Sequence, residues 1–448
     1  MAQQDAPRGI VLDILMQVTR DGVFSHIALR QALSAHPGLS RKERAFITRC
    51  TEGTIERMIE LDYILNTYSK TPVNKMKPVI RCILRSALYE ILYMDSVPDS
   101  AACNEAVKLT QKRGLSGLKG FVNGILRNII RNKAHLKYPD PAQHLLQALS
   151  VRYSMPEWLL ARFQKQYGRA KCEAILKSFY VKRPVTARVD TGRISPEEFT
   201  GRMRAHGVKA VPLGHQAAFA LSGYDRLQEL PEFTEGLFYL QDVASMQAVD
   251  SVDFARLIAE ARGRPVRVLD VCAAPGGKSI QAAWMLRDAG MVTARDLSEA
   301  KVALIRENSL RCRTGNLTAQ VRDALCYDPD CGERMDLVIA DLPCSGLGVL
   351  ARKTDIKYRA GEEQIKELAG LQQRILSVAC RYVRPGGILL YSTCTLTPEE
   401  NTCNTAAFLQ SHPSFALLTE QEITPDQGCD GFYIAQMIRR RADRIQAE

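Results

Sequence analysis

Two cysteines end apolar segments in the second half of the chain. Cys344 lies in IADLPCSGLG (339–348), and Cys394 lies in LLYSTCTLTPEEN (389–401). Short apolar runs of this kind are typical of buried parallel strands, whose carboxyl ends carry the ligands and the chemistry of open α/β sheets. Both thiols also follow a glycine-rich turn, VLDVCAAPGGKS (268–279). Together these segments predict a cofactor pocket with a sulfur nucleophile beside it.

The glycine-rich turn differs from the dinucleotide-binding fingerprint, because its glycines, Gly276 and Gly277, are adjacent. The small residues and the proline before them let the backbone pass close to a ligand, and the helix that follows offers free amides to a carboxylate. An acid ends each of three further expected strands, namely Asp296, Asp323 and Asp341. The first of these suits a ribose diol, and the second suits the surroundings of an adenine amino group. Three acids in register favour an adenosyl ligand over three unrelated helix caps.

From residue 266 onward, apolar runs of strand length alternate with helical segments. The clearest helix is expected over 363–383, where apolar residues form one stripe. This alternation predicts a parallel, doubly wound α/β sheet of the Rossmann-like kind. The expected strands cover residues 266–272, 291–296, 318–323, 336–343, 387–394 and 431–440.

Residues 1 to about 133 are expected to be entirely helical. Apolar doublets recur every four residues over 79–92 and over 121–130, which gives each helix one broad apolar face. Helices of this type pack into a bundle. Between residues 108 and 133 there are seven Lys and Arg and no acid, which favours binding to phosphate groups. These cations are Lys108, Lys112, Arg113, Lys119, Arg127, Arg131 and Lys133.

Two prolines in KYPDPAQH (137–144) interrupt the helical pattern and indicate a boundary. The segment that follows mixes helices with short strands, which predicts a small α+β subdomain. Its expected elements are helices over 155–168 and 195–207, a strand over 183–191, and a strand entering a helix over 236–248. We therefore expect three domains: an all-α bundle over 1–137, an α+β subdomain over 145–250 and an α/β domain over 251–448.

The composition limits the class of protein and its partners. Sixty Lys and Arg against 49 Asp and Glu give the 448 residues a formal charge of +11 and a pI near 9.0, which favours a nucleic acid as partner. Thirteen cysteines without a regular framework indicate reduced thiols, so we expect a cytoplasmic protein. Cys326 and Cys331 have no second pair or His at ligand spacing, and we expect no metal site. Because no apolar run reaches the roughly 18 to 20 residues that span a bilayer, no membrane partner is expected.

Five strings follow one another in the helical segment. They are RGIVLDILMQV (8–18), RKERAFITRCTEGTIER (41–57), ILRSALYEILYM (83–94), AACNEAVKLTQKRG (101–114) and GFVNGILRN (120–128). In this order they resemble the NusB-like RNA-binding helical domain. The resemblance covers most of residues 8–133 and implies that this domain binds RNA.

The strings AAPGGK (273–278), DLPCS (341–345) and STC (392–394) carry a second resemblance. With them, residues 236–440 resemble the RsmB/Fmu (Sun) family of RNA cytosine-C5 methyltransferases. This resemblance implies S-adenosylmethionine as methyl donor and a cytosine of small-subunit ribosomal RNA as substrate. It also implies that Cys394 is the nucleophile and that Cys344 assists product release. The donor is then assigned to Cys272, Ala273, Ala274, Pro275, Gly276, Gly277, Lys278, Asp296, Asp323 and Asp341.

Two thiols and an acid suit this chemistry. Cytosine C5 is a poor nucleophile, so a thiolate first adds at C6 and makes C5 reactive. Asp341, three residues before Cys344, is expected to hydrogen-bond the base edge and to perform or orient protonation at N3. After methyl transfer the bond between Cys394 and C6 must break, and we expect Cys344 to assist that step. Lys278 and Lys353 are candidates for activating the nucleophilic thiol.

The segment ARKTDIKYR (351–359) places four cations just after Cys344, which favours an RNA clamp over a solvated loop. Here the sequence departs from the family pattern. Thr354 stands where proline is common, and Tyr358 stands where tryptophan is common. These departures bear on substrate contacts and leave the expected reaction unchanged.

Three functions stay open at this point. The leading one is methylation of small-subunit ribosomal RNA, and the second is the same chemistry on transfer RNA; the NusB-like segment favours the first. The third is a non-catalytic NusB-like RNA-binding or assembly factor, which the intact pair of Cys344 and Cys394 argues against. DNA methylation is disfavoured, because single-cysteine DNA enzymes use the thiol of the PC motif and need no Cys394. We expect the protein to act as a monomer.

Overall fold

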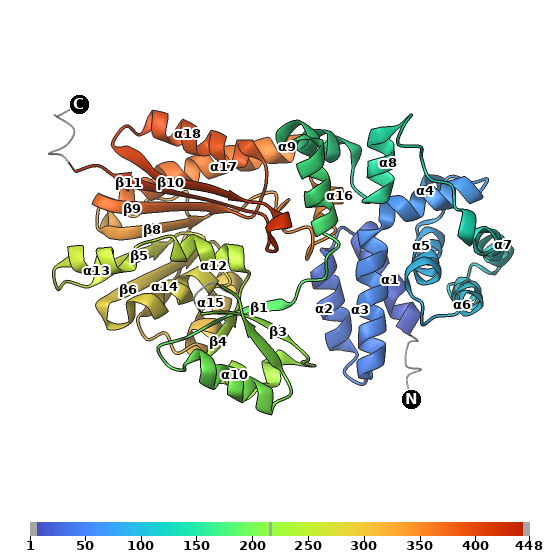
Figure 1. Cartoon of the computed structure of the whole chain (residues 1–448), viewed down its shortest axis with the longest axis horizontal. Coiled ribbons are helices and arrows are strands. Elements are labelled where there is room, and N and C mark those ends of the chain that lie inside the picture. Colours follow the sequence, from blue (N-terminus) through green and yellow to red (C-terminus); the bar gives the residue numbers. More distant parts are fainter. Residues whose placement is uncertain (1–6, 215–216, 442–448) are drawn as a thin grey trace. The chain divides into compact units, whose positions relative to one another are not determined.

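The computed structural model describes residues 7–214 and 217–441, and its contacts divide the chain into two compact units (Figure 1). The helical unit comprises Met1–Phe179 and Leu350–Arg359. The sheet unit comprises Tyr180–Val349 and Ala360–Glu448. The boundaries of the three domains expected from the sequence stay a prediction.

The helical unit is built around α5, whose apolar doublets are buried as the sequence predicts. Ile80, Ile83, Leu84, Ala87, Leu88 and Ile91 are each at most 2% exposed. Proline at the first position of α5 and a capping box at Ser40 before α3 mark the beginnings of these helices. The helices are α1 (Pro7–Thr19), α2 (Ser25–Ala35), α3 (Arg41–Glu56), α4 (Met58–Tyr68), α5 (Pro78–Tyr93), α6 (Asp99–Lys112), α7 (Lys119–Arg131), α8 (Leu145–Arg152), α9 (Glu157–Ser178) and α16 (Ile356–Arg359).

The sheet unit begins with a small antiparallel sheet in the order β2-β3-β1-β4. Three phenylalanines, Phe199, Phe219 and Phe238, meet edge to face in its core, where α10 covers the strands. The elements are β1 (Val185–Val189), α10 (Pro196–Ala205), β2 (Lys209–Pro212), β3 (Ala218–Ser222), α11 (Pro231–Thr234) and β4 (Phe238–Leu240). The predicted α+β subdomain is therefore present.

The larger sheet has seven strands in the order β10-β11-β9-β8-β5-β6-β7. The pairs from β9 to β7 are parallel, whereas β11 pairs antiparallel with both β9 and β10. The strands are β5 (Val266–Asp270), β6 (Gly290–Asp296), β7 (Leu317–Val321), β8 (Met335–Asp341), β9 (Val383–Thr393), β10 (Phe415–Ile423) and β11 (Phe432–Arg439). This mostly parallel sheet confirms the predicted Rossmann-like α/β class.

Helices cover both faces of this sheet, because alternate strand residues are apolar on each side. Val268, Val292 and Leu337 pack with α12 to α15 on one face, and Leu269 and Val338 pack with α17 and α18 on the other (Figure 1). The helices are α12 (Val243–Asp250), α13 (Phe254–Ala261), α14 (Gly277–Leu286), α15 (Glu299–Arg311), α17 (Glu362–Ala379) and α18 (Thr402–Ser411).

The sequence interpretation missed β10. Most of its residues are exposed, because β10 lies at the edge of the sheet, and its TEQE stretch lacks the apolar run that marked the other strands. Within the two described stretches, none of the helices combines the length and the apolar composition that crossing a bilayer requires.

Candidate active site

The residues expected to do chemistry meet at the carboxyl edge of the seven-stranded sheet. Asp270 ends β5, Asp296 ends β6 and Asp341 ends β8. Cys394 follows the last residue of β9, and Asp341 is in register with Ser392 on that strand. The strand order therefore sets the thiols on the β8 and β9 side of the edge and the glycine-rich turn on the β5 and β6 side.

The two thiols lie next to each other. The Sγ atoms of Cys344 and Cys394 are 3.3 Å apart, and the two cysteines are not joined by a disulfide. A close backbone approach makes this possible, since Gly348 N donates to Cys394 O at 3.0 Å and Gly431 N donates to Gly348 O at 2.8 Å. A Cβ on Gly348 would lie 2.1 Å from Gly431 O, so only glycine fits there.

Cys344 keeps its proton in this arrangement. Its contact with the Cys394 sulfur, and after that its loss of hydration, raise the pKa of Cys344 well above its ordinary value. The Cys344 thiol can therefore donate a hydrogen bond to the Cys394 sulfur, although the geometry allows either sulfur to be the donor. Such a donor stabilises a thiolate on Cys394.

A buried carboxylate, Glu400, holds the two cysteine-bearing loops together. It is 0% exposed and accepts hydrogen bonds from Ser345 N at 2.8 Å, Ser345 Oγ at 2.5 Å, Thr397 Oγ1 at 2.5 Å and Gln372 Nε2 at 3.1 Å. Ser345 Oγ also lies 2.7 Å from Thr395 Oγ1. The residue after Cys344 is thus hydrogen-bonded to the residue after Cys394.

The glycine-rich turn is fixed at both ends by Asp270. Its Oδ2 accepts from Ser279 Oγ at 2.6 Å, and its Oδ1 accepts from Cys272 N at 3.4 Å. Burial is the main cause that raises the pKa of Asp270 to about 7. Between these anchors Gly276 takes a φ of +110°, which glycine adopts without strain, and α14 begins directly after it. The backbone of the turn is thereby held in one shape.

An ion pair joins the turn to the thiol side of the edge. Lys278 Nζ lies 2.7 Å from Asp341 Oδ2 and 2.9 Å from Ser245 Oγ, and it stands 5.0 Å above the Phe432 ring. Ser392 Oγ donates to Asp341 Oδ1 at 2.8 Å. The ammonium is 7% exposed, whereas the carboxylate is 31% exposed. Asp341 is therefore held firmly while part of it stays open to a ligand.

The remaining two acids differ in what they contact. Asp296 is buried; its Oδ2 accepts from Ala274 N at 3.0 Å, its Oδ1 accepts from Leu297 N at 2.8 Å, and Lys301 Nζ lies 3.0 Å away. Asp323, after β7, accepts from Leu325 N at 2.9 Å. The structure thus brings Asp296 into contact with the turn, while among the described residues the hydrogen bonds to Asp323 come from its own loop.

Comparisons with known proteins agree with this geometry. The family described as "16S rRNA methyltransferase RsmB/F" matches residues 262–438, the NusB family matches residues 5–131, and an RsmF/B-like ferredoxin-like domain matches residues 155–223. The "Probable ribosomal RNA small subunit methyltransferase B" of Bacillus subtilis is 32% identical, and the match covers 97% of this chain and 98% of that protein. The "Ribosomal RNA small subunit methyltransferase B" of Yersinia pestis is 30% identical over 92% of this chain and 95% of that protein.

The chain belongs to the RsmB/F family. It is an S-adenosylmethionine-dependent methyltransferase of ribosomal RNA, which confirms the predicted enzyme class and methyl donor. Among solved structures, that of PH0851 superposes with a TM-score of 0.80 at 24% identity and covers 98% of this chain and 100% of that chain. At this identity the likeness supports the fold alone.

In this RsmB/F member the segment Leu350–Arg359, which follows Cys344, is part of the helical unit and forms hydrogen bonds within it. Asp355 accepts from Ser25 Oγ at 2.6 Å, and Lys357, which is 4% exposed, donates to Glu56 O at 2.8 Å. Arg359 donates to Gly22 O and Val23 O. The expectation of an RNA clamp is wrong for Lys357 and Arg359, because backbone carbonyls of the helical unit take up both cations.

Tyr358, the departure from the family's tryptophan, is likewise a packing residue. Its hydroxyl donates to Ile55 O at 2.8 Å, and burial is the main cause that raises its pKa. The change to tyrosine therefore concerns the fold of the helical unit. Arg352 and Lys353 stay exposed in the same segment.

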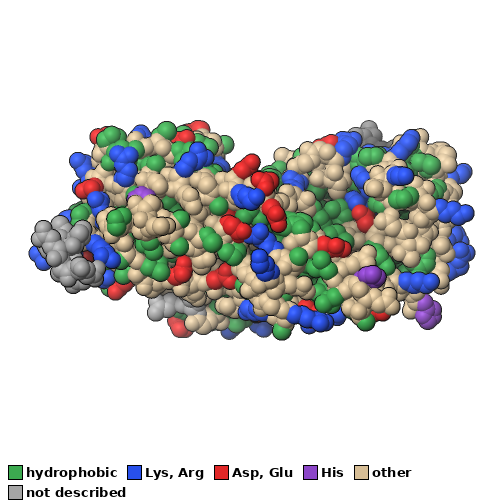
Figure 2. All heavy atoms as spheres, turned by 90° about the horizontal axis from the view of Figure 1, so that it is seen from above, with side chains coloured by type: hydrophobic (Ala, Val, Ile, Leu, Met, Phe, Trp, Pro, Cys, Tyr) green, Lys and Arg blue, Asp and Glu red, His purple; other side chains and the backbone are tan. Residues whose placement is uncertain are grey.

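The basic segment of the helical unit is also partly neutralised. The sequence shows no acid over 108–133, yet Lys108, Arg113 and Lys133 pair with the acids Glu105, Asp13 and Asp99 at 2.7, 2.7 and 3.0 Å. Figure 2 shows many basic side chains on the surface of this unit, on the right of the view. Four of the seven cations have no ion pair among the described residues: Lys112, Lys119, Arg127 and Arg131.

Sequence reasoning missed Asp270, Glu400, Ser245 and Ser392. Asp270 carried a usable signal, because it ends its strand as the three chosen acids do. Ser392 lies in the STC string, but nothing in the sequence pointed to its contact with Asp341 in the neighbouring strand. Glu400 and Ser245 carried no signal, since their partners are distant in sequence.

Proposed function

We propose that this rRNA methyltransferase acts on C5 of a cytosine in small-subunit rRNA, with Cys394 as the nucleophile and Cys344 as its proton-donating partner. The observation that carries the proposal is the 3.3 Å separation of the two sulfurs at the edge that also holds the glycine-rich turn. The names of the relatives favour the small-subunit substrate over transfer RNA. The intact thiol pair disfavours a non-catalytic assembly factor.

The chemistry of the surrounding residues fits S-adenosylmethionine. The turn Cys272–Lys278, together with Asp296, Asp323 and Asp341, would hold the donor, since acids suit its ribose hydroxyls and its cationic groups. When bound, the donor supplies an electrophilic methyl group. The proposal leaves Cys272 out of the nucleophilic chemistry, because burial is the main cause that raises its pKa and keeps it a thiol.

The residues then act in a defined order. The Cys394 thiolate, stabilised by the Cys344 thiol, adds to C6 of cytosine and breaks the C5–C6 double bond, so that the electron pair moves to C5. Asp341, held by Lys278 and Ser392, hydrogen-bonds the base edge and orients protonation at N3. C5 takes up the methyl group, with S-adenosylhomocysteine as the leaving group, and then loses its proton to water. As the C6–S bond breaks and the double bond returns, the Cys344 thiol again hydrogen-bonds the sulfur that leaves.

The experiment is to incubate an rRNA fragment with each cysteine variant and to resolve covalent adducts on a denaturing gel. Cys394→Ala should give neither methylation nor adduct, whereas Cys344→Ala should accumulate adduct, because the C6–S bond breaks slowly. Cys403→Ala, an exposed cysteine outside the proposed site, is the matched control and should behave as wild type. An adduct that survives loss of Cys394 and disappears with loss of Cys344 would reverse the two roles.

We also propose a cytoplasmic monomer whose N-terminal residues 1–137 contribute RNA affinity. Two thiols 3.3 Å apart must stay reduced to react, and the cytoplasm keeps thiols reduced. The exposed cations of α6 and α7 support the RNA-binding role. Light scattering on the free enzyme tests the monomer.

A further inference from the structure

Arginines gather at the edge of the seven-stranded sheet opposite the thiols. The parallel strands β5, β8 and β9 begin at this edge, and the antiparallel β11 ends there. Arg267 is the second residue of β5, Arg334 directly precedes β8, Arg384 is the second residue of β9, and Arg441 follows β11. We call Arg262, Arg264, Arg267, Arg334, Arg384 and Arg441 the arginine edge.

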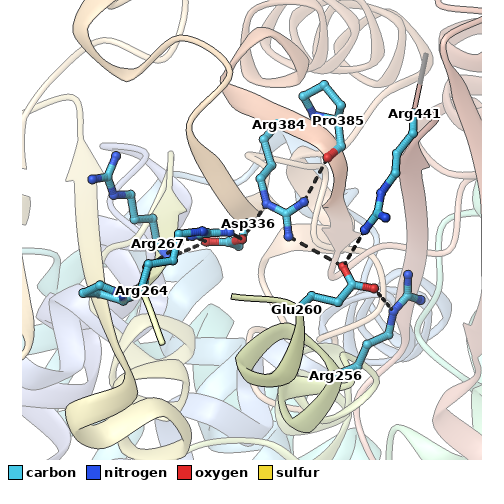
Figure 3. A network of polar contacts seen from close by, with 9 residues as sticks. Arg256, Glu260, Arg264, Arg267, Asp336, Arg384, Pro385 and Arg441 are labelled. Carbon is cyan, nitrogen blue, oxygen red and sulfur yellow. Dashed lines mark hydrogen bonds and ion pairs between the residues drawn. The ribbon is translucent and has the colours of Figure 1, made fainter. Parts of the chain in front are cut away.

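One part of the arginine edge is rigid. Asp336, 0% exposed, accepts from both Nη atoms of Arg264 at 2.7 and 2.5 Å, from Arg384 Nε at 2.6 Å and from Arg267 N at 2.9 Å (Figure 3). Burial acts to raise the pKa of Asp336, but these hydrogen bonds outweigh it and hold the pKa below its ordinary value. Asp336 is therefore a fixed anion that orients two guanidinium groups.

A second acid extends the network. Glu260 lies 2.9 Å from Arg256 Nε, 3.6 Å from Arg384 Nη2 and 3.2 Å from Arg441 Nη2, as Figure 3 shows. A third acid nearby, Glu333, pairs with Arg439 at 2.5 Å. These three carboxylates, Asp336, Glu260 and Glu333, are thus already bound to arginine.

Three arginines are left over. Arg262, Arg267 and Arg334 are exposed, and among the described residues their guanidinium groups have no hydrogen bond, ion pair or ring contact. Arg262 lies two residues before Arg264, which binds Asp336, and Arg334 lies two residues before Asp336 itself. The net charge of this edge is therefore strongly positive, and its unpaired cations stand beside groups that are held in place.

The chemistry of the cations indicates the partner. Every cation named here is arginine, whose planar fork of N–H donors matches the oxygens of a phosphate. The Asp336 cluster limits the side-chain freedom that binding would otherwise remove. A polyanion with regularly spaced phosphates is the complementary partner for such a surface.

We propose that the arginine edge is a second RNA-binding surface, which binds the sugar-phosphate backbone of rRNA at the side of the sheet remote from the thiols. The inference rests on the proposed rRNA substrate and extends it: an rRNA long enough to reach both edges is bound by both. A short hairpin around the target cytosine engages the catalytic edge alone.

The test compares two double variants with the same change in formal charge. Arg262→Glu/Arg334→Glu alters the arginine edge, and Lys366→Glu/Arg374→Glu alters exposed cations of α17. With a long 16S rRNA fragment, the first variant should bind about tenfold more weakly, and the slope of log K against log salt should fall by about 2. The control should match wild type. Methylation of a short hairpin at saturation and donor affinity should be unchanged in both.

Two results would overturn the inference. One is equal binding of the long fragment by the two double variants at several salt concentrations. The other is loss of binding to phosphatidylglycerol vesicles by the first variant without any loss of RNA binding, which would assign the surface to a membrane. Failure of the wild type to methylate the rRNA fragment would instead refute the proposed function, and the binding comparison would still decide the role of the arginine edge.

Discussion

Removing the Glu400 carboxylate should separate the two thiols. In Glu400→Ala, the hydroxyl of Ser345 can turn to Thr395 Oγ1, but Ser345 N and Gln372 Nε2 lose an acceptor inside the protein. Each buried N–H without a partner costs about 1–3 kcal/mol, so the free energy of unfolding should fall by about 2–6 kcal/mol. Ser345 follows Cys344 directly, so the loss of this contact also loosens the position of the Cys344 sulfur.

Glu400→Gln is the matched control. Its carbonyl oxygen can still accept from the two N–H donors, and its amide can donate to the two hydroxyls, so the loss should be about 1–2 kcal/mol. The position of the thiols should then persist.

The assay pairs urea unfolding with the rate of adduct formation on the rRNA fragment under single-turnover conditions. A shift of about 1 Å between reacting groups can cost about 100-fold in rate, so Glu400→Ala should form adduct far more slowly than Glu400→Gln, with donor affinity unchanged in both. An Ala variant with wild-type stability and a wild-type rate of adduct formation would refute the argument. A parallel fall in donor affinity would show that Glu400 supports the whole edge and has no special relation to the thiols.

Three further predictions concern the donor, the turn and the helical unit. Asp296→Ala should weaken donor binding by about 1–3 kcal/mol in calorimetry, because it removes acceptors for the ribose and for Ala274 N. Lys301→Ala, which removes only an exposed ammonium near Asp296, should change donor binding by less than about 0.5 kcal/mol. Because the pKa of Asp270 is raised to about 7, the folded protein keeps a proton that the unfolded chain releases between about pH 4 and pH 7. The free energy of unfolding should therefore fall as pH rises through this range. In Asp270→Asn, thermal unfolding midpoints measured across the same range should fall less. Reversing exposed cations of α7 to Glu should weaken rRNA binding and reduce its salt dependence without altering donor affinity, and unchanged binding at several salt concentrations would contradict this. The cations are Lys119, Arg127 and Arg131.

The sequence predicts the buried strands well, because a strand covered on both faces must be apolar along its length. The edge strand β7 was predicted although most of it is exposed, whereas β5, β6, β8, β9 and β11 meet this condition. β10 does not, because an edge strand with one exposed side has no such requirement, and its pairing with β11 is decided in three dimensions. The error over Lys357 and Arg359 has a related cause, because a run of cations in a sequence suggests an exposed surface segment. Only the fold shows that backbone carbonyls of α3 and of the loop before α2 accept hydrogen bonds from these two cations.

The sequence predicts that Cys344 and Cys394 each lie at the end of a strand, but it does not predict that their sulfur atoms lie 3.3 Å apart. Cys344 and Cys394 are 50 positions apart in the chain, and their contact depends on Gly348 and Gly431, which let two loops touch at the backbone. Glu400 was missed for the same reason. Its partners come from three segments, and no local pattern distinguishes it from a surface glutamate.

Strand order explains why two acids with the same sequence context differ. Asp296 ends β6, the neighbour of β5, so its carboxylate reaches the amide of Ala274 in the turn that follows β5. Asp323 follows β7, which is one strand further from the turn, and its carboxylate accepts from Leu325 N in its own loop. In sequence, both are acids after a short apolar strand. Adjacency to the turn is set by the order in which the strands pair, so only Asp296 positions the turn directly, and any contact of Asp323 with the donor must be made across the width of β6.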